Sequence, residues 1–154
     1  MKITSSFKGK SVHTINESGR ISIPAKFRDV LKTKYNEDSL VLVNLGKYLA
    51  AYPVKEWEKV ESKFEENPPK NKQAAKLMRK LFSTAEDCSL DRLGRILIPP
   101  HLRNGVGLNG ECVIVGMMNK IEIWPKDVWE SEVEDTDMST LMEEINDIYP
   151  EITL

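Results

Sequence analysis

The sequence predicts an α+β fold in which two tandem repeats close on each other as a pseudo-twofold unit, with helices between and after them. The first observation is an internal repeat: NESGRISIPAKFR at residues 16–28 returns as DRLGRILIPPHLR at residues 91–103, with six of thirteen positions identical. The second is that short alternating apolar segments, bounded by glycine and proline, follow in each copy, which is typical of strands. Two copies are too few for an open stacked array, so a closed unit is expected.

The elements of the two copies are expected in the same order. A strand leads into a glycine-containing turn, a short alternating strand follows, and proline opens a short helix because its fixed φ suits the first helical turn. The strands expected on this basis cover residues 11–15, 21–23, 40–45 and 48–52, then residues 96–98, 111–117 and 120–124. The repeat spacing falls from 75 to 72 residues, so the connection after the short helix should be three residues shorter in the second copy.

Helices are expected outside the repeats. One begins after the proline that closes the first copy, and Asn-Pro-Pro-Lys-Asn at residues 67–71 breaks it. Residues 72–85 then read as a helix with one apolar face and one basic face. After Trp129, two short acidic helices are expected, with Leu141, Ile145 and Ile148 facing inward. The predicted organisation is a first repeat over 8–57, connecting helices over 58–85, a second repeat over 86–129 and an acidic C-terminal helical segment over 130–154.

The net charge of -2 combines two parts of opposite charge. Residues 127–151 hold ten acids and no Lys or Arg, so the remaining residues carry 22 bases against 14 acids, a net charge of +8. Neutralising phosphates releases counterions, so a basic body predicts a salt-sensitive affinity for double-stranded DNA. Eight bases lie in the first 34 residues, beside only two acids: Lys2, Lys8, Lys10, Arg20, Lys26, Arg28, Lys32 and Lys34.

The two repeated turns should each be shaped by an Asx residue and a glycine: Asn16 and Gly19 in the first, Asp91 and Gly94 in the second. An Asx side chain at the start of a turn accepts backbone N–H bonds two or three residues on, and glycine permits a positive φ. The arginines that end the turns, Arg20 and Arg95, have two open interpretations. They either brace the Asx side chain or project toward phosphates and guanine edges.

Other classes of function find little support in the sequence. Its apolar runs are too short to cross a bilayer, and the polar N-terminus does not resemble a secretory signal. Cys88 and Cys112 have no CxxC spacing, which fits a reducing cytoplasm, and we expect both to be buried. His13 and His101 are expected to be structural. Without a nucleophile–base pair, metal-ligand spacing or phosphate-cradling loop, we expect no enzyme activity, metal, cofactor or small-molecule substrate.

The doubled D-x-x-G-R-[ILV]-x-[IL]-P element resembles the MraZ family, which belongs to the SpoVT/AbrB-like class. The opening FKGK at residues 7–10, the segment AEDCSLD at residues 85–91 and the paired Tyr-Pro and Trp-Pro dipeptides at residues 52–53 and 124–125 add to this resemblance. It covers roughly residues 6–129. A single GRI-x-IP would be weak, whereas the doubled motif and its spacing are specific.

The resemblance implies an AbrB-like swapped-hairpin β-barrel, also called a double-wing fold. It implies a cytoplasmic, nucleoid-associated regulator of transcription, a repressor in our expectation. Such proteins assemble into multi-subunit rings and bind repeated boxes upstream of the division and cell-wall gene cluster. The family's acid and arginine map onto Asp91 and Arg95; Asn16 replaces the acid beside Arg20, which removes a salt bridge there. The DNA-binding residues expected from the resemblance and from charge are Arg20, Arg95, Lys8, Lys10, Lys26 and Arg28.

Two alternatives stay open. An antitoxin-like protein-interaction module would neutralise a basic enzyme with its acidic tail, and AbrB-like folds also occur in antitoxins, so fold alone does not decide. The doubled copy and the apolar stripe expected to dock the tail argue against this alternative. The basic face of residues 72–80 is either solvated, a contact for the DNA backbone, or a contact for a neighbouring acidic tail, which could close a ring head to tail.

Overall fold

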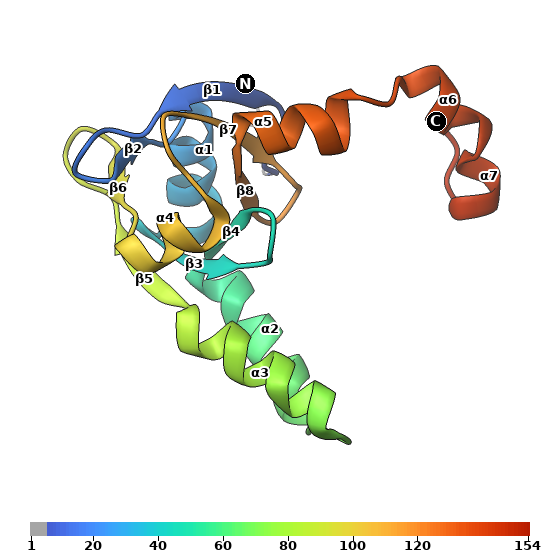
Figure 1. Ribbon diagram of the computed structural model, residues 1–154, viewed down its shortest axis with the longest axis horizontal. Helices are drawn as coiled ribbons and strands as arrows, with labels where there is room; N and C mark the ends of the chain where they lie inside the picture. The colour runs from blue at the N-terminus through green and yellow to red at the C-terminus, as the bar shows by residue number, and fades with distance from the viewer. Residues whose placement is uncertain (1–5) are drawn as a thin grey trace.

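The computed structural model describes residues 6–154, in which eight strands form a six-stranded antiparallel sheet and a separate two-stranded ribbon (Figure 1). Lys2 lies outside the described residues. The sheet has the order β1-β7-β8-β4-β3-β5, and β2 pairs with β6 in the ribbon. The first copy contributes β1 (Lys10–Thr14), β2 (Arg20–Ser22), β3 (Ser39–Asn44) and β4 (Leu49–Pro53). The second contributes β5 (Glu86–Ser89), β6 (Arg95–Leu97), β7 (Glu111–Gly116) and β8 (Ile121–Pro125).

The two copies are interleaved. Strands β1 to β4 correspond to β5 to β8, and exchanging the copies gives the same strand order in reverse. Each leading strand pairs with the other copy: β1 with β7, and β5 with β3. The register follows the same relation, since Thr14 lies opposite Glu111 and its equivalent Ser89 lies opposite Ser39. The repeats therefore form one unit with a twofold relation in its topology.

The closed barrel expected from the resemblance is not found in residues 6–154. The six-stranded sheet ends at β1 and β5, and the ribbon is a sheet of its own. Each ribbon strand has only three residues. These offer too few ladder groups to bridge the two edges of the sheet. The fold is therefore a mixed α and β arrangement around an open antiparallel sheet.

The short helices differ between the copies as the repeat spacing predicts. Helix α1 (Ala25–Val30) continues into a π-helical turn, η1 (Leu31–Tyr35), whereas α4 (Pro100–Val106) ends at Gly107 with a φ of +74°. This confirms that the second copy is shorter between its helix and its next strand. The longer first helix brings Tyr35 into the core, where its hydroxyl donates to the Glu56 carboxylate at 2.6 Å.

A helical hairpin packs on β3 and β4 at one face of the sheet and extends away from it (Figure 1). It consists of α2 (Val54–Glu66) and α3 (Lys72–Thr84), and the Asn71 side chain accepts the Ala74 N–H as the cap of α3. Strand β3 is buried on both faces because its side chains alternate between two cores: Leu42 packs in the main core, and Val43 packs with the hairpin. The main core also contains the isoleucines of the ribbon and the apolar residues of α1 and α4. Both cysteines are buried and free, as expected.

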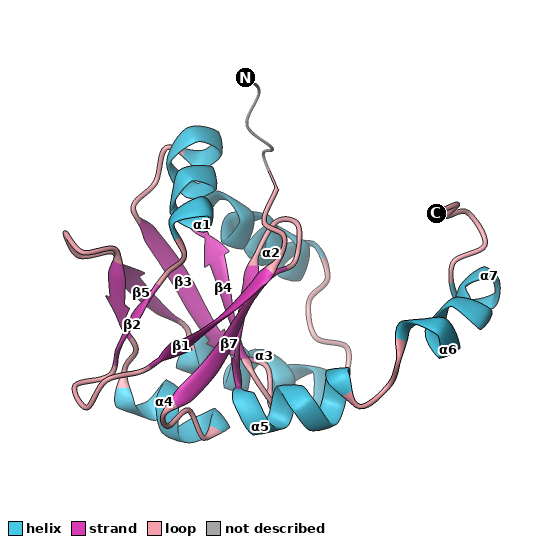
Figure 2. Cartoon of the chain, turned by 90° about the horizontal axis from the view of Figure 1, so that it is seen from above, coloured by secondary structure: helices cyan, strands magenta, loops and turns pink. Residues whose placement is uncertain are grey.

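The C-terminal segment corrects an expectation. After α5 (Lys126–Trp129) and the π-helical turn η2 (Glu130–Glu134), the chain forms α6 (Met138–Glu143) and α7 (Ile145–Ile148), which stand away from the body in both views (Figures 1 and 2). The inward packing expected for the apolar stripe is wrong: Leu141 is 44% exposed and Ile148 is 55% exposed. The two helices are too short, and too rich in acids, to offer the sheet a continuous apolar face.

Among residues 6–154, none of the helices combines the length and the apolar character that a membrane span needs.

Candidate nucleic-acid interface

The first repeated turn is held by the side chain of Asn16. Its Oδ1 accepts the backbone N–H groups of Ser18 at 3.1 Å and Arg20 at 2.9 Å, together with the Ser18 hydroxyl at 2.8 Å. Gly19 has a φ of +92°, a conformation in which glycine avoids the strain of a side chain. The guanidinium of Arg20 donates to the Ser18 hydroxyl at 3.0 Å. The Arg20 side chain is thus oriented by the neutral hydroxyl of Ser18.

The second turn has the same backbone and a different charge. Asp91 Oδ1 accepts the N–H groups of Leu93 and Arg95, each at 2.9 Å, and Gly94 has a φ of +76°. The second carboxylate oxygen accepts Arg95 Nε at 3.0 Å. The Arg95 N–H and guanidinium together hold the pKa of Asp91 below its usual range. This arginine is therefore paired with an acid, whereas Arg20 forms no ion pair within residues 6–154.

The ribbon brings the two arginines onto one surface. Arg20 lies opposite Leu97, and Arg95 lies opposite Ser22, so both arginines are on the same face of the β2–β6 pair. The other face carries Ile21 and its partner across the ribbon, both buried in the main core. Because side chains alternate along a strand, the arginine face points outward, and both arginines are partly exposed. Two arginines far apart in the sequence therefore share one rigid, projecting element.

Two further arginines brace the turns across the copies. Arg28 Nε donates to the Ile23 carbonyl at 3.0 Å, and its guanidinium lies against Gly94 of the other copy, 2.7 Å from where a Cβ would stand. Arg103 makes the equivalent bond to Ile98 at 2.9 Å and lies equally close to Gly19. Sequence reasoning placed Arg28 among the DNA-binding residues and overlooked Arg103. The repeat carried the signal, because these two arginines form its last identical pair.

The predicted lysines are not gathered on the ribbon. Lys8 is exposed close to β1, and the Lys26 ammonium lies over the ring of Phe27, 5.5 Å from its centroid. Lys10 forms an ion pair with Glu134 at 2.7 Å, so its charge is already compensated by the acidic segment. The Lys10 ammonium and the Trp129 indole both donate hydrogen bonds to the Glu134 carboxylate, and these bonds hold its pKa below its usual value. Lys26 and Lys10 thus have contacts of their own away from the two turns.

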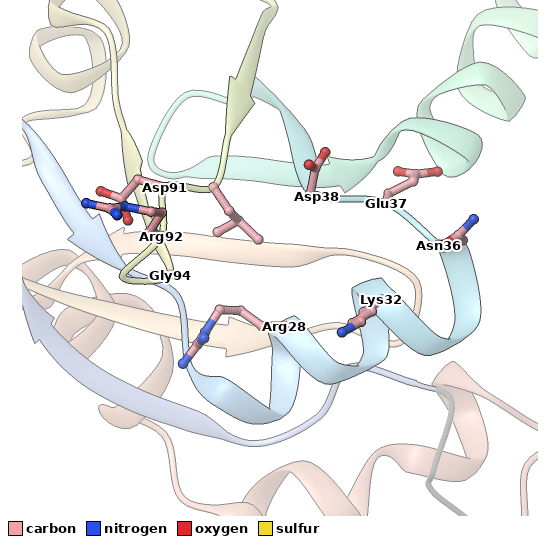
Figure 3. A pocket seen from close by; sticks show the side chains of 9 residues that line it. Arg28, Lys32, Asn36, Glu37, Asp38, Asp91, Arg92 and Gly94 are labelled. Atoms are coloured by element: carbon pink, nitrogen blue, oxygen red, sulfur yellow. The ribbon is translucent and has the colours of Figure 1, made fainter.

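An open pocket of about 510 Å³ adjoins the second turn (Figure 3). Helix α1 and the η1 turn supply Arg28 and Lys32 on one side, and the turn supplies Asp91 and Arg92 on the other (Figure 3). Glu37 and Asp38, with Asn36, Leu90 and Gly94, complete the lining. Three bases and three acids line it, so the pocket has no charge preference for a small anion. Arg28 and Gly94, which are in contact across the copies, both line it.

The family model described as "MraZ protein, putative antitoxin-like" matches residues 6–80 and again residues 81–145. The chain belongs to the MraZ family. Proteins named "Transcriptional regulator MraZ" are similar over most of their length: 42% identity with that of Lachnoclostridium phytofermentans over 96% of this chain and 98% of the relative, and 41% with that of Syntrophobacter fumaroxidans over 82% and 84%. The Pediococcus pentosaceus protein is 39% identical over 85% and 89%.

Membership of the MraZ family agrees with the interleaved topology. The family model matches twice, once to each half of the chain, and the two matches meet inside α3. MraZ is a family of transcriptional regulators and not a class of enzymes. The DNA-binding role of the arginines and the boundaries of the two repeats stay predictions.

Proposed function

We propose that this protein is a sequence-specific DNA-binding regulator of transcription that reads the major groove with the β2–β6 ribbon. One observation carries the proposal: Arg20 and Arg95 share the exposed face of a two-stranded antiparallel ribbon. The major groove admits a two-stranded β-ribbon, and arginine pairs with both acceptors on the edge of guanine. The names of the relatives support regulation of transcription as the outcome.

The other predicted residues have supporting roles in this proposal. Lys8 and Lys26 contact phosphates beside the ribbon. Arg28 holds the second turn through its bond to the Ile23 carbonyl, and its remaining guanidinium nitrogens meet the backbone of the DNA. Lys10 contributes once its ion pair with Glu134 opens. In this proposal the two turns present arginines that contact base edges, and the lysines add an affinity for phosphates that depends on salt.

The proposal extends to assembly and target. The protein binds repeated boxes upstream of the division and cell-wall gene cluster as a repressor, located in the cytoplasm with the nucleoid. It does so as a ring of several subunits, because one ribbon buries little DNA and linked units gain avidity. The interleaved strand order supports a swapped-hairpin relation of the AbrB-like kind between the two copies.

Arginine substitutions test the ribbon. The Arg20→Ala and Arg95→Ala variants should each weaken binding to the region upstream of the protein's own gene by about 1–3 kcal/mol, the usual value of a bidentate base contact. Lys63→Ala is the control, because Lys63 is an exposed residue of α2 in the helical hairpin. Gel-shift titration at a fixed salt concentration measures the effect. Parental affinity in both arginine variants would contradict the proposal.

One observation favours the antitoxin-like alternative. The apolar stripe of the acidic C-terminal segment was expected to dock on the body; α6 and α7 stand away from it instead, as a segment that neutralises a basic enzyme would (Figures 1 and 2). The description of the matching family as antitoxin-like agrees with this reading. The two functions separate experimentally. Retention on heparin and a shift of promoter DNA support regulation, whereas co-purification with a basic partner without either supports the alternative.

A further inference from the structure

We propose that the C-terminal tail of one subunit docks on the α3 face of a second copy of this chain. The tail is residues 136–154, and the α3 face is the exposed surface formed by Lys72, Lys76, Leu77, Arg79 and Lys80. This inference rests on the self-association proposed above and names the two surfaces that carry it. Three properties of the tail and the α3 face support it: uncovered apolar side chains, matching charges and placement.

The tail has apolar side chains that nothing in residues 6–154 covers. Met138, Leu141, Met142 and Ile145 recur at the spacing of one helical face, and the first three are exposed by 69%, 44% and 38%. The Asp137 side chain caps α6 by accepting the Thr140 N–H at 2.9 Å. The tail therefore consists of two short helices, α6 and α7, whose apolar side chains have no partner within residues 6–154. Apolar side chains at i, i+3, i+4 and i+7 are the anchors with which a helical segment binds in a groove.

The α3 face offers a groove of matching character. A hollow of about 420 Å³ lies between α3, the β3–β4 turn and the end of α4. Its apolar lining includes Leu45, Leu77 and Leu81. Leu77 is 58% exposed, one turn of α3 before the buried Leu81. Lys80 stands at the rim of this groove. An apolar helix flanked by acids therefore finds both apolar contact and a cationic border here.

The charges of the two surfaces are complementary. Residues 67–85 contain five bases and no acid, whereas residues 136–154 contain five acids and no base. Within residues 6–154, none of those five bases forms an ion pair: Lys70, Lys72, Lys76, Arg79 and Lys80. Opposite potentials steer two surfaces together and fix their register.

Placement makes the contact intermolecular. The segment that leads to the tail is tied to the body by two ion pairs, Lys10 with Glu134 and Lys47 with Glu132, both at 2.7 Å. From there α6 and α7 point away from the body, and α3 lies on another side of the molecule (Figure 1). Each subunit then offers one tail and one α3 face, which is a heterologous interface that closes into a ring when its rotation permits.

DNA is the competing occupant of the α3 face. Phosphates would contact the same lysines and arginine, but they gain nothing from contact with the exposed Leu77 or with the apolar groove beside it. The ribbon that carries Arg20 and Arg95 also lies at a different edge of the fold from α3 (Figure 1). The combination of bases with an apolar groove therefore favours the acidic amphipathic tail.

Charge reversal in the full-length chain tests the contact. Sedimentation velocity should give the parent a mass that is a multiple of 17.6 kDa. The α3 variant Lys76→Glu/Arg79→Glu and the tail variant Glu143→Lys/Glu144→Lys should each sediment as monomers. A chain with all four changes should regain the parental mass, because the reversed charges again attract. The control Lys32→Glu/Lys34→Glu makes the same change of charge on η1 and should keep the parental mass.

Apolar variants test the head-to-tail geometry. Leu77→Asp spoils the α3 face, and Leu141→Asp spoils the tail. Each variant alone should be monomeric, and an equimolar mixture should form a pair of twice the monomer mass and nothing larger, because one intact tail meets one intact face.

The outcomes separate the two proposals. If the parent assembles and every variant assembles equally, the docking is wrong and the self-association stands. A parent that is monomeric at all concentrations overturns both. The variant Lys76→Glu/Arg79→Glu could instead keep the parental mass and lose affinity for a short DNA duplex. That result would assign the α3 face to DNA and overturn the docking.

Discussion

Exchanging Asp91 for Asn would make the second turn an electrostatic copy of the first. The amide oxygen can accept the same two N–H groups that Asp91 Oδ1 accepts at 2.9 Å, so the turn should persist. The variant loses the carboxylate that holds Arg95 at 3.0 Å. If the ribbon faces DNA, the change removes one negative charge from the binding surface and frees one arginine. We therefore expect tighter binding.

The magnitude follows from counterion release. One additional phosphate neutralised changes the slope of log K against log salt by about 0.9, which at about 0.1 M salt corresponds to roughly eightfold in affinity. The reverse change, Asn16→Asp, places a new acid beside Arg20 and should weaken binding by a similar factor. The double variant restores the net charge of -2 and should bind within about twofold of the parent, if both turns contribute equally.

Fluorescence anisotropy with a labelled duplex from the region upstream of the gene, titrated at several salt concentrations, measures both affinity and slope. Urea unfolding of each variant checks that the turn is intact. Equal slopes for the parent, Asp91→Asn and Asn16→Asp would refute the reasoning, because a charge at the contact surface must enter the salt dependence.

Three further predictions concern the packing of the fold. Gly19→Ala should destabilise the chain more than Gly46→Ala in urea unfolding. Both glycines have a positive φ, in which a residue with a side chain is strained by about 1–2 kcal/mol. Only at Gly19 would the new Cβ also displace the Arg103 guanidinium. Equal losses of unfolding free energy in the two variants would contradict the brace. Tyr35→Phe should cost about 1–3 kcal/mol at pH 7, because it leaves the buried Glu56 carboxylate short of a donor. Burial raises the pKa of Glu56, but the hydrogen bonds from Tyr35 and a lysine outweigh burial, so the pKa is lowered in the folded state. The stability that this carboxylate contributes is therefore present above the unfolded-state pKa and is lost as the pH falls. The difference in unfolding free energy between the parent and Tyr35→Phe should shrink toward pH 4. Burial raises the pKa of both cysteine thiols to about 11, so iodoacetamide should label the native protein far more slowly than the urea-unfolded one; equal rates would show that the thiols are accessible.

The repeat was the part of the sequence that predicted most of the structure. It located the turns, the short strands and the shortened connection after Pro99, because each depends on local residues such as glycine and proline. Which strand pairs with which was beyond local reasoning. An alternating segment shows that a strand has a buried face, but β1 and β5 each found their partner in the other copy.

The site was predicted in part for the same reason. Motif reasoning singled out Arg20 and Arg95, yet only the ribbon register places them on one face. The brace formed by Arg103 joins two segments more than eighty residues apart; the repeat marks Arg103 as the equivalent of Arg28 but does not show which turn it contacts. The prediction that the tail docks on the body was wrong for another reason. An apolar stripe at helical spacing indicates that a helix packs against something, but it does not say whether its own chain or another molecule supplies that surface.

The interleaved strand order also has a consequence for synthesis of the chain. Thr14 finds its partner only when Glu111 has been made, so β1 cannot join the sheet early. At a ribosomal rate of about 5–20 residues per second, that interval lasts roughly 5–20 s. During it the nascent first half exposes apolar strands with unpaired ladder groups. We expect this period, rather than the finished fold, to be the time when the chain most needs a chaperone.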